Sequence, residues 1–268
     1  MTEEQPGPGP RFDTSVASIA RIYDYWLGGK DNFKVDREAA EEMIQAFPGI
    51  MAGVRMNRAF LGRAIHYLAA DVGIRQFLDI GTGLPSANNT HEVAQRAAPE
   101  SRIVYVDNDP IVLSHAKALL TSAPEGACAY IDADIRNTGQ ILKEAAGTLD
   151  FSRPVAVCLI MILQFIPDED DPWQITRTLM DAVPSGSYLV VAHPANDVDV
   201  VVAPALRQLS MRMGGTRALP RSRAEVMRFF EGLELVEPGL VQLHRWRPGA
   251  GVDTGKNLAA YGGVARKP

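Results

Sequence analysis

The first part of the chain places apolar side chains at helical spacing and predicts three helices. The first begins near Asp13 or Thr14, either of which is a suitable N-cap residue, and ends at Gly28. The second covers Asp36–Phe47, and the third runs from about Ile50 to Val72 before a glycine. We therefore expect an N-terminal helical segment over residues 13–73, which we interpret as a lid.

After this segment, short apolar runs alternate with helical patterns. The predicted strands are Arg75–Ile80, Arg102–Asp107, Ala127–Asp132, Val155–Ile162 and Ser187–Ala192. The predicted helices between them are Ser86–Ala98, Asp109–Leu120, Thr138–Ala146 and Asp171–Val183. This alternation favours an α/β fold with a doubly wound parallel sheet that helices cover on both faces.

The two ends of the chain depart from this alternation. After a helical pattern over Val200–Met213 and a predicted capping box at Ser222 and Glu225, short strands are expected from Leu233 onward. Residues 1–12 are rich in Pro and Gly and are expected to form a disordered tail. The predicted organisation is thus a tail (1–12), a helical lid (13–73) and a sheet domain (74–268).

Composition narrows the possible classes of protein. The 268 residues are 46% hydrophobic and carry a net charge of −5, which suits one large globular domain and argues against a general nucleic-acid binder. The two cysteines have no metal-ligand spacing, so no metal site is expected. There is neither a signal-peptide pattern nor an apolar run long enough to cross a bilayer, so we expect a cytoplasmic protein that does not bind membranes.

The most informative motif is Phe77–Pro85, where the first predicted strand gives way to a helix. Asp79, Gly81 and Gly83 form an Asp-x-Gly-x-Gly turn. Glycines here let the backbone turn tightly and let a ligand approach it, at the strand end where doubly wound sheets bind ligands. A tight strand–helix turn without a ligand would explain the same two glycines.

Two further carboxylates follow at the ends of the next predicted strands. Asp107 is placed to accept hydrogen bonds from both hydroxyls of a ribose, because Asp109 already serves as helix cap before Pro110. Asp134 lies one strand end further along, where a carboxylate can accept from an adenine amino group. Together these acidic strand ends predict a pocket for an adenosine-containing ligand.

Other nucleotide-binding fingerprints are missing. Pro85 and Ser86 follow Gly83, so the loop has neither the third glycine of a dinucleotide site nor the Lys-Ser/Thr pair of a P-loop. A nicotinamide-dependent oxidoreductase is therefore the less favoured alternative.

With these motifs in place, the chain resembles the class I S-adenosylmethionine (SAM)-dependent methyltransferases. It is most similar to a bacterial S-adenosyl methyltransferase family, and the resemblance covers about residues 14–268. The matching segments, besides the glycine turn, are Ala20–Phe33, Val104–Pro110, Ala133–Arg136, Leu163–Asp168 and Tyr261–Pro268.

The resemblance implies SAM as the cofactor and a seven-stranded, Rossmann-like, mostly parallel sheet with an antiparallel C-terminal strand. The glycine turn would bracket the methionine part of SAM and Asp107 would hold the ribose. Asn108 would flank the adenine, while Asp134 and the backbone N–H of Ile135 would bind it. Gln164 stands where many class I enzymes carry histidine, so a histidine base is not available there.

Several residues outside these motifs are candidates for the reaction itself. His193, just after the fifth strand, is the best acid–base candidate, although a lone histidine at a strand end is more often simply hydrogen-bonded to its neighbours. Tyr25 is expected to face the site from the lid, and Lys30 or Arg58 to meet the SAM carboxylate. Alternatively, the lid aromatics form helix–helix core and the charges are solvated.

The sequence therefore predicts a methyltransferase that acts on a small-molecule acceptor and exists as a monomer or homodimer. A general base is needed only if the acceptor must lose a proton, so its absence does not contradict this prediction. The alternative is a SAM-binding protein without transferase activity, acting as a sensor or partner.

Overall fold

The computed structural model describes residues 14–119, 121–249, 251, 255 and 257–268. The expected disordered tail over residues 1–12 and the Asp13 cap lie outside these residues.

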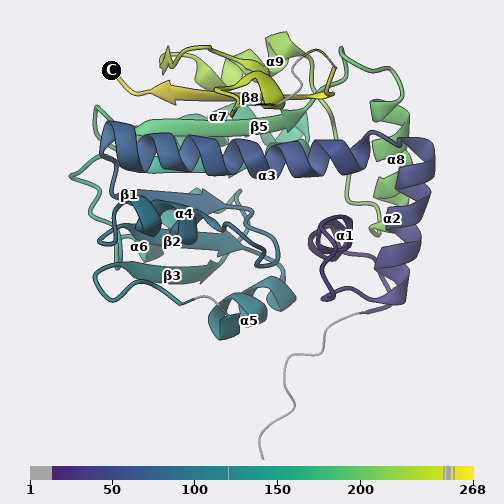
Figure 1. Cartoon of the computed structure of the whole chain (residues 1–268), viewed down its shortest axis with the longest axis horizontal. Coiled ribbons are helices and arrows are strands. Elements are labelled where there is room, and N and C mark those ends of the chain that lie inside the picture. Colours follow the sequence, from purple (N-terminus) through teal and green to yellow (C-terminus); the bar gives the residue numbers. More distant parts are fainter. Residues whose placement is uncertain (1–13, 120, 250, 252–254, 256) are drawn as a thin grey trace, which may run out of the picture.

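One sheet runs through the centre of the molecule (Figure 1). Its strand order is β3-β2-β1-β4-β5-β8-β6, and β7 also pairs with β8. The strands are β1 (Gln76–Ile80), β2 (Arg102–Asp107), β3 (Ala127–Asp132), β4 (Ala156–Ile160), β5 (Tyr188–Pro194), β6 (Glu234–Leu235), β7 (Val241–Gln242) and β8 (Ala260–Arg266). Neighbouring strands among β1–β5 pair in parallel and β8 pairs antiparallel with β5, which confirms the predicted Rossmann-like fold class.

Over the residues described, the sheet has eight strands rather than the expected seven. The outer edge of β8 is shared between two short segments, because β6 pairs with Ala265 and Arg266 while β7 pairs with Tyr261 and Gly262. The chain turns away between them at Gly239, whose φ is +85°. One continuous edge strand is therefore replaced by two strands.

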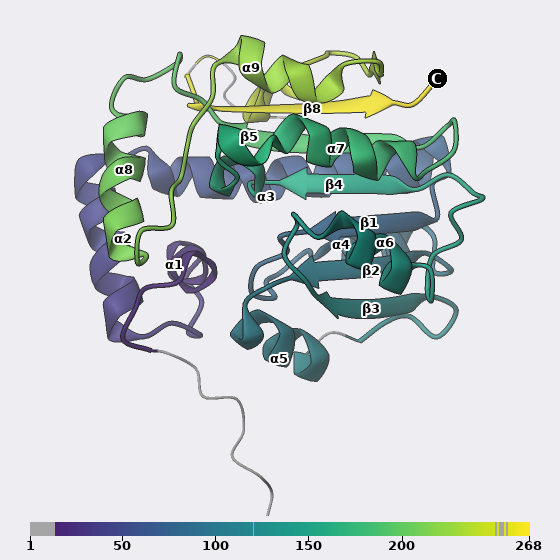
Figure 2. The ribbon, with the colours of Figure 1, turned by 180° about the vertical axis from the view of Figure 1, so that it is seen from behind.

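Helices cover both faces of the sheet (Figures 1 and 2). On one face, α3 (Ile50–His66) and α4 (Thr90–Ala97) bury Phe60 and Val93 against strand residues such as Phe77 and Ile103. On the other face, α6 (Thr138–Ala145), α7 (Pro172–Asp181) and α9 (Arg223–Met227) pack against residues such as Leu78. The alternating side chains of each strand thus supply two separate apolar cores, as expected for a doubly wound sheet.

The remaining helices lie toward the carboxyl ends of the parallel strands (Figures 1 and 2). They are α1 (Ile19–Trp26), α2 (Lys34–Ala46), α5 (Pro110–Leu119) and α8 (Val202–Arg212). Helices α1, α2 and α8 share a third apolar cluster with the start of α3. None of the described helices has the length and apolar character that a bilayer-spanning segment needs.

Helix α1 begins later than the sequence predicts, at Ile19 rather than near residue 13 or 14. The chain before it is held by tertiary contacts instead: the backbone N–H of Ser18 donates to Asp36 Oδ1 (2.9 Å), and its hydroxyl donates to Asp109 Oδ2 (2.7 Å). These contacts tie the start of α1 to α2 and to the end of β2.

Candidate functional site

A cavity of about 740 Å³ opens at the carboxyl ends of the central strands. The strand ends and the loops after them form one side, α1 and α3 form the opposite wall, and the segment after α8 closes a third side. Its size lies within the range of about 300–1,000 Å³ that is typical of small-molecule sites.

The structure brings most of the predicted site residues to this cavity. Those that line it are Arg58, Asp79, Gly81, Gly83, Asp107, Asn108, Asp134 and Ile135. Tyr25, Lys30 and His193 are not among its lining residues.

The loop after β1 requires glycine at two positions for different reasons. Gly81 and Gly83 have φ angles of +78° and +65°, which residues with side chains rarely adopt. A Cβ atom on Gly81 would also lie 2.7 Å from Ile162, because the loop after β4 packs directly on this backbone. A Cβ atom on Gly83 would meet nothing within 4 Å, so this glycine keeps the cavity wall clear.

Asp79 is a buried carboxylate at the cavity wall. Thr90 Oγ1 donates a hydrogen bond to its Oδ2 atom over 2.5 Å. Burial raises the pKa of Asp79 to about 6, although the Thr90 hydrogen bond and the positive charge of Arg58 oppose this increase. Since an ionised but poorly solvated carboxylate gains from a nearby positive charge, the cavity favours a cation here.

Asp107 ends β2 with hydrogen-bonding capacity left over. Its Oδ2 accepts the Gly83 N–H (2.9 Å) and its Oδ1 accepts the Asp109 N–H (3.0 Å). Burial raises the pKa of Asp107 above its usual value, although these backbone hydrogen bonds act in the opposite direction. Each carboxylate oxygen has two lone pairs, so both can accept one more donor from the cavity. Asp109 caps α5 by accepting the Ile111 N–H (2.9 Å), which confirms its predicted capping role.

The third strand end is more open and is already partly paired. Asp134 accepts from Arg136 Nη1 (2.9 Å) and from Asn108 Nδ2 (3.2 Å). Arg136 Nε also donates to Asp170 Oδ2 (2.7 Å), so this arginine links the loop after β3 to the loop after β4. The backbone N–H of Ile135 makes no hydrogen bond to any other described residue and remains available as a donor.

Arg58 is the cation that the helical wall contributes. Its Nη2 atom donates to the carbonyls of Ala87 (3.0 Å) and Asn88 (2.9 Å). Its Nε is buried and has no hydrogen-bond partner within the described part of the chain. The side chain lines the cavity and lies close enough to Asp79 to affect its pKa.

Two lid candidates point elsewhere. The Tyr25 hydroxyl donates to Glu41 Oε1 on α2 (2.6 Å), and Lys30 is exposed to solvent. Tyr25 lies on a different face of α1 from the cavity-lining residues Ala20, Tyr23 and Asp24.

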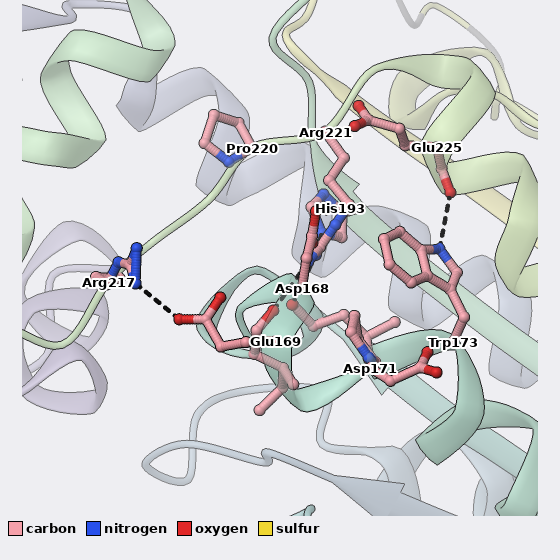
Figure 3. Close-up of polar contacts among 12 residues, drawn as sticks. Asp168, Glu169, Asp171, Trp173, His193, Arg217, Pro220, Arg221 and Glu225 are labelled. Carbon is pink, nitrogen blue, oxygen red and sulfur yellow. Dashed lines mark hydrogen bonds and ion pairs between the residues drawn. The ribbon is translucent and has the colours of Figure 1, made fainter.

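His193 lies in the protein interior beside Arg221 (Figure 3). Its Nε2 is 3.0 Å from Arg221 Nη1 and its Nδ1 is 2.8 Å from the Pro194 carbonyl. A guanidinium only donates, so Nε2 is the acceptor and the ring proton lies on Nδ1. Burial lowers the pKa of His193 to about 3. With both nitrogens engaged and no place in the cavity wall, His193 is not positioned to take a proton from a substrate.

Arg221 organises the loop after β4, a role that the sequence did not suggest. Its guanidinium donates to the carbonyls of Leu163 (2.9 Å) and Ile166 (2.8 Å) and to Asp168 Oδ1 (2.7 Å). The same side chain lies 5.2 Å from the Trp173 ring centroid (Figure 3). The Leu163–Asp168 motif is thus held by one buried arginine that is distant in sequence.

The N-terminal motif has a local structural basis. Asp24 Oδ2 accepts the Asp31 N–H (2.9 Å) and Asn32 Nδ2 (2.8 Å), so the carboxylate holds the turn after α1. A Cβ atom on Gly29 would overlap the Asp24 carboxylate. The spacing of Asp24, Gly29 and Asn32 therefore follows from packing within this turn.

Comparison with known proteins identifies the family. The sequence profile of the S-adenosyl methyltransferase family matches residues 5–268. The chain belongs to the S-adenosyl methyltransferase family. It is a methyltransferase and its cofactor is SAM, which decides against the sensor and oxidoreductase alternatives.

Solved structures of other proteins share this fold over most of the chain. A DUF574-family protein from Streptomyces avermitilis is 48% identical, with 96% of this chain and 100% of that chain covered and a TM-score of 0.93. A proposed methyltransferase from Thermobifida fusca is 37% identical, covers 98% and 99%, and has a TM-score of 0.89. The plantazolicin methyltransferase BpumL, solved with S-adenosylhomocysteine, shares the fold at 10% identity, coverage of 93% and 95%, and a TM-score of 0.54. The search of the curated proteins found no match.

The cavity suits SAM in its chemistry. The buried carboxylate of Asp79 attracts a cationic ligand, and the unused lone pairs of Asp107 can accept hydrogen bonds from hydroxyl groups. Gly83 leaves space in which a ligand can approach the backbone. Within the described residues, no group of three or more His, Cys, Asp or Glu side chains is arranged to hold a metal ion.

Proposed function

We propose that this S-adenosyl methyltransferase methylates a small molecule and holds SAM with the row of carboxylates at the ends of β1, β2 and β3. In this arrangement Asp79, Gly81 and Gly83 surround the methionine part, and Arg58 meets its carboxylate. Asp107 binds the ribose hydroxyls, while Asn108, Asp134 and Ile135 surround the adenine. The observation that carries the proposal is that all of these residues line one cavity.

The methyl group of bound SAM is the electrophile. A lone pair of the acceptor forms the new bond to the methyl carbon, the carbon–sulfur bond breaks with its electron pair going to sulfur, and any proton released from the acceptor passes to solvent. The protein's contribution is to position the two reactants and exclude water. Gln164 is buried and donates to the Met161 carbonyl (2.8 Å), so it shapes the loop after β4.

A small acceptor is supported by the covering of the cavity. Helix α1 lies across the strand ends, and Ser18 fastens it to Asp109. We infer that α1 is the part of the predicted lid (13–73) that covers the site. A cytoplasmic location and a monomeric or homodimeric state remain predictions.

The test is transfer of a tritiated methyl group from SAM into a cell extract divided by ultrafiltration into small molecules and macromolecules. After unreacted SAM has been removed from the small-molecule fraction by chromatography, we expect label to remain there in methylated product, and much less of it with the Asp107→Ala variant at the same SAM concentration. Label confined to macromolecules would contradict a small-molecule acceptor. Calorimetry with S-adenosylhomocysteine on the same samples shows whether the cofactor site is intact.

A further inference from the structure

The cavity extends beyond the acidic strand ends into a region with apolar walls. Tyr23 and Leu27 of α1, Phe165 of the loop after β4 and Met213 at the end of α8 all line it. The same four side chains pack in one apolar cluster, so they form a continuous surface. None of them carries a charge, in contrast to the carboxylates on the cofactor side.

One polar pair interrupts this surface. The Tyr23 hydroxyl accepts from Asn57 Nδ2 (2.7 Å) and donates to the Val54 carbonyl (3.4 Å). A phenol oxygen has two lone pairs, so the Tyr23 oxygen can accept one further hydrogen bond. Asn57 lines the cavity at 4% exposure, and its Oδ1 has no hydrogen-bond partner among the described residues. Both unused positions are therefore acceptors.

These groups stay uncharged at neutral pH. Burial raises the pKa of Tyr23, although the hydrogen bond from Asn57 and the charge of Arg58 act in the opposite direction. A ligand in this region thus meets a neutral hydroxyl and a neutral amide within an apolar wall. The charged side chains nearby already have partners, because Arg58 is assigned to the SAM carboxylate, Asp24 holds the turn after α1 and Arg217 pairs with Glu169. A charged ligand would therefore lose its hydration there without gaining a free opposite charge.

We propose that this region is the acceptor subsite and that the acceptor is a neutral molecule with an apolar body and an N–H or O–H group that donates to Tyr23 and Asn57. The inference rests on the proposed function, in which the polar groups of SAM already have partners at the strand ends and on Arg58. Tyr23 and Asn57 are then left for the second substrate.

The subsite is built before any acceptor arrives. Arg221 donates to the carbonyls of Leu163 and Ile166, which lie on either side of Phe165 in the chain. The segment after α8 is joined to the same loop, because the Leu219 N–H donates to the Gln164 carbonyl (2.8 Å). A rigid apolar wall with few polar positions is the usual form of a small-molecule site.

The test uses four naphthalene probes substituted at the same ring position: naphthol, methoxynaphthalene, naphthoate and naphthylmethylammonium. Calorimetry measures their binding to the protein saturated with S-adenosylhomocysteine. We expect naphthol to bind about fivefold more tightly than methoxynaphthalene, which cannot donate a hydrogen bond. We expect both charged probes to bind at least about tenfold more weakly than naphthol.

Tyr23→Phe and Tyr25→Phe form a matched pair of variants on one helix. Tyr23→Phe should abolish the preference for naphthol, whereas Tyr25→Phe should keep it, because the Tyr25 hydroxyl binds Glu41 outside the cavity. The dissociation constant of S-adenosylhomocysteine should stay within about twofold in both variants, since neither hydroxyl is assigned to the cofactor.

Three results would overturn the subsite: equal binding of naphthol and methoxynaphthalene, tighter binding of a charged probe, or no binding of any probe. A large loss of S-adenosylhomocysteine affinity in Tyr23→Phe would instead assign Tyr23 to the cofactor and also refute the inference. These failures are distinct from failure of the proposed function, which would appear as absence of methyl transfer into small molecules.

Discussion

Asp107 is the residue whose proposed role can be tested most directly. Asp132 is a natural control, because it is the register partner of Asp107 on β3 but is exposed and does not line the cavity. We expect Asp107→Ala to weaken SAM binding by about 1–3 kcal/mol, since two ribose hydroxyls lose a charged acceptor in a partly buried site. Asp132→Ala should leave binding unchanged. Calorimetry measures the SAM affinity of both variants. Equal affinities would place the ribose contact elsewhere.

The raised pKa of Asp79 predicts a pH dependence of SAM binding. With a pKa of about 6, the carboxyl group is largely protonated at low pH, and a bound cation favours its ionised form. Binding must then release a proton below about pH 6 and gains affinity as the pH rises to about 7, where the gain levels off. Asp79→Asn should remove this dependence. An affinity of the wild type that is constant from about pH 5 to 7 would contradict the prediction.

The sequence locates the residues that line the cavity better than the residues that connect one element to another. Asp79, Asp107 and Asp134 could be found because apolar runs show where parallel strands end, and strand ends meet at one edge. Tyr25 and His193 were selected by residue type and by their place in the lid or at a strand end, neither of which shows where a side chain points. Nothing local in the sequence shows that His193 lies against Arg221, because 28 residues separate them.

Among the elements, the loop after β4 depends on a single side chain from another part of the chain. Arg221 is 3% exposed and satisfies two carbonyls, His193 and Asp168 together. Lysine keeps the charge but has no planar fork of donors, so it cannot replace these contacts. The loop should therefore loosen locally when Arg221 is changed.

We expect Arg221→Lys to lower the free energy of unfolding by about 2–3 kcal/mol, because buried carbonyls lose their partners. Amide exchange of Phe165 and Ile166 should become faster than in the wild type. Arg223→Lys is the control, since Arg223 is exposed and its side chain has the Leu240 carbonyl (3.1 Å) as its one hydrogen-bond partner among the described residues. Denaturation and hydrogen exchange measure both effects, and an equal loss of stability in the two variants would refute the special role of Arg221.

Element boundaries were predictable where local signals decide them. Arg102–Asp107 and Ala127–Asp132 form strands over the expected residues, and Ser222 with Glu225 forms the expected capping box. The late start of α1 and the division of the edge strand were not predictable. They depend on contacts of Ser18 with Asp36 and on pairing with β8, which lie outside any local window.

For the whole molecule, the N-terminal helices are part of the fold rather than a separate body. Arg63 of α3 donates to the carbonyls of Trp246 (2.8 Å) and Leu243 (2.7 Å) near the C-terminal strands. Arg212 of α8 pairs with Glu42 of α2. Opening of the proposed lid is therefore expected to involve α1 and the turn after it, while α3 stays on the sheet.

Stability of the whole molecule combines two buried groups whose pH effects have opposite signs. The pKa of His193 is about 3 in the folded protein against 6.5 without burial, so the unfolded chain takes up a proton first as the pH falls below about 6.5. This costs about 2 kcal/mol of stability at pH 5. The pKa of Asp79 is about 6 against 3.8, so the folded protein takes up a proton first and gains about 1.5 kcal/mol at the same pH.

The two effects nearly cancel in the cofactor-free wild type, whose unfolding free energy should change by less than about 1 kcal/mol between pH 7 and 5 on account of these groups. Asp79→Asn cannot titrate, so only the contribution of His193 remains. The variant should therefore lose about 2 kcal/mol over the same interval. Urea denaturation at both pH values measures the difference. If the variant changes no more than the wild type, His193 does not stay neutral in the folded protein at pH 5, and the proton assignment between Arg221 and Pro194 fails with it.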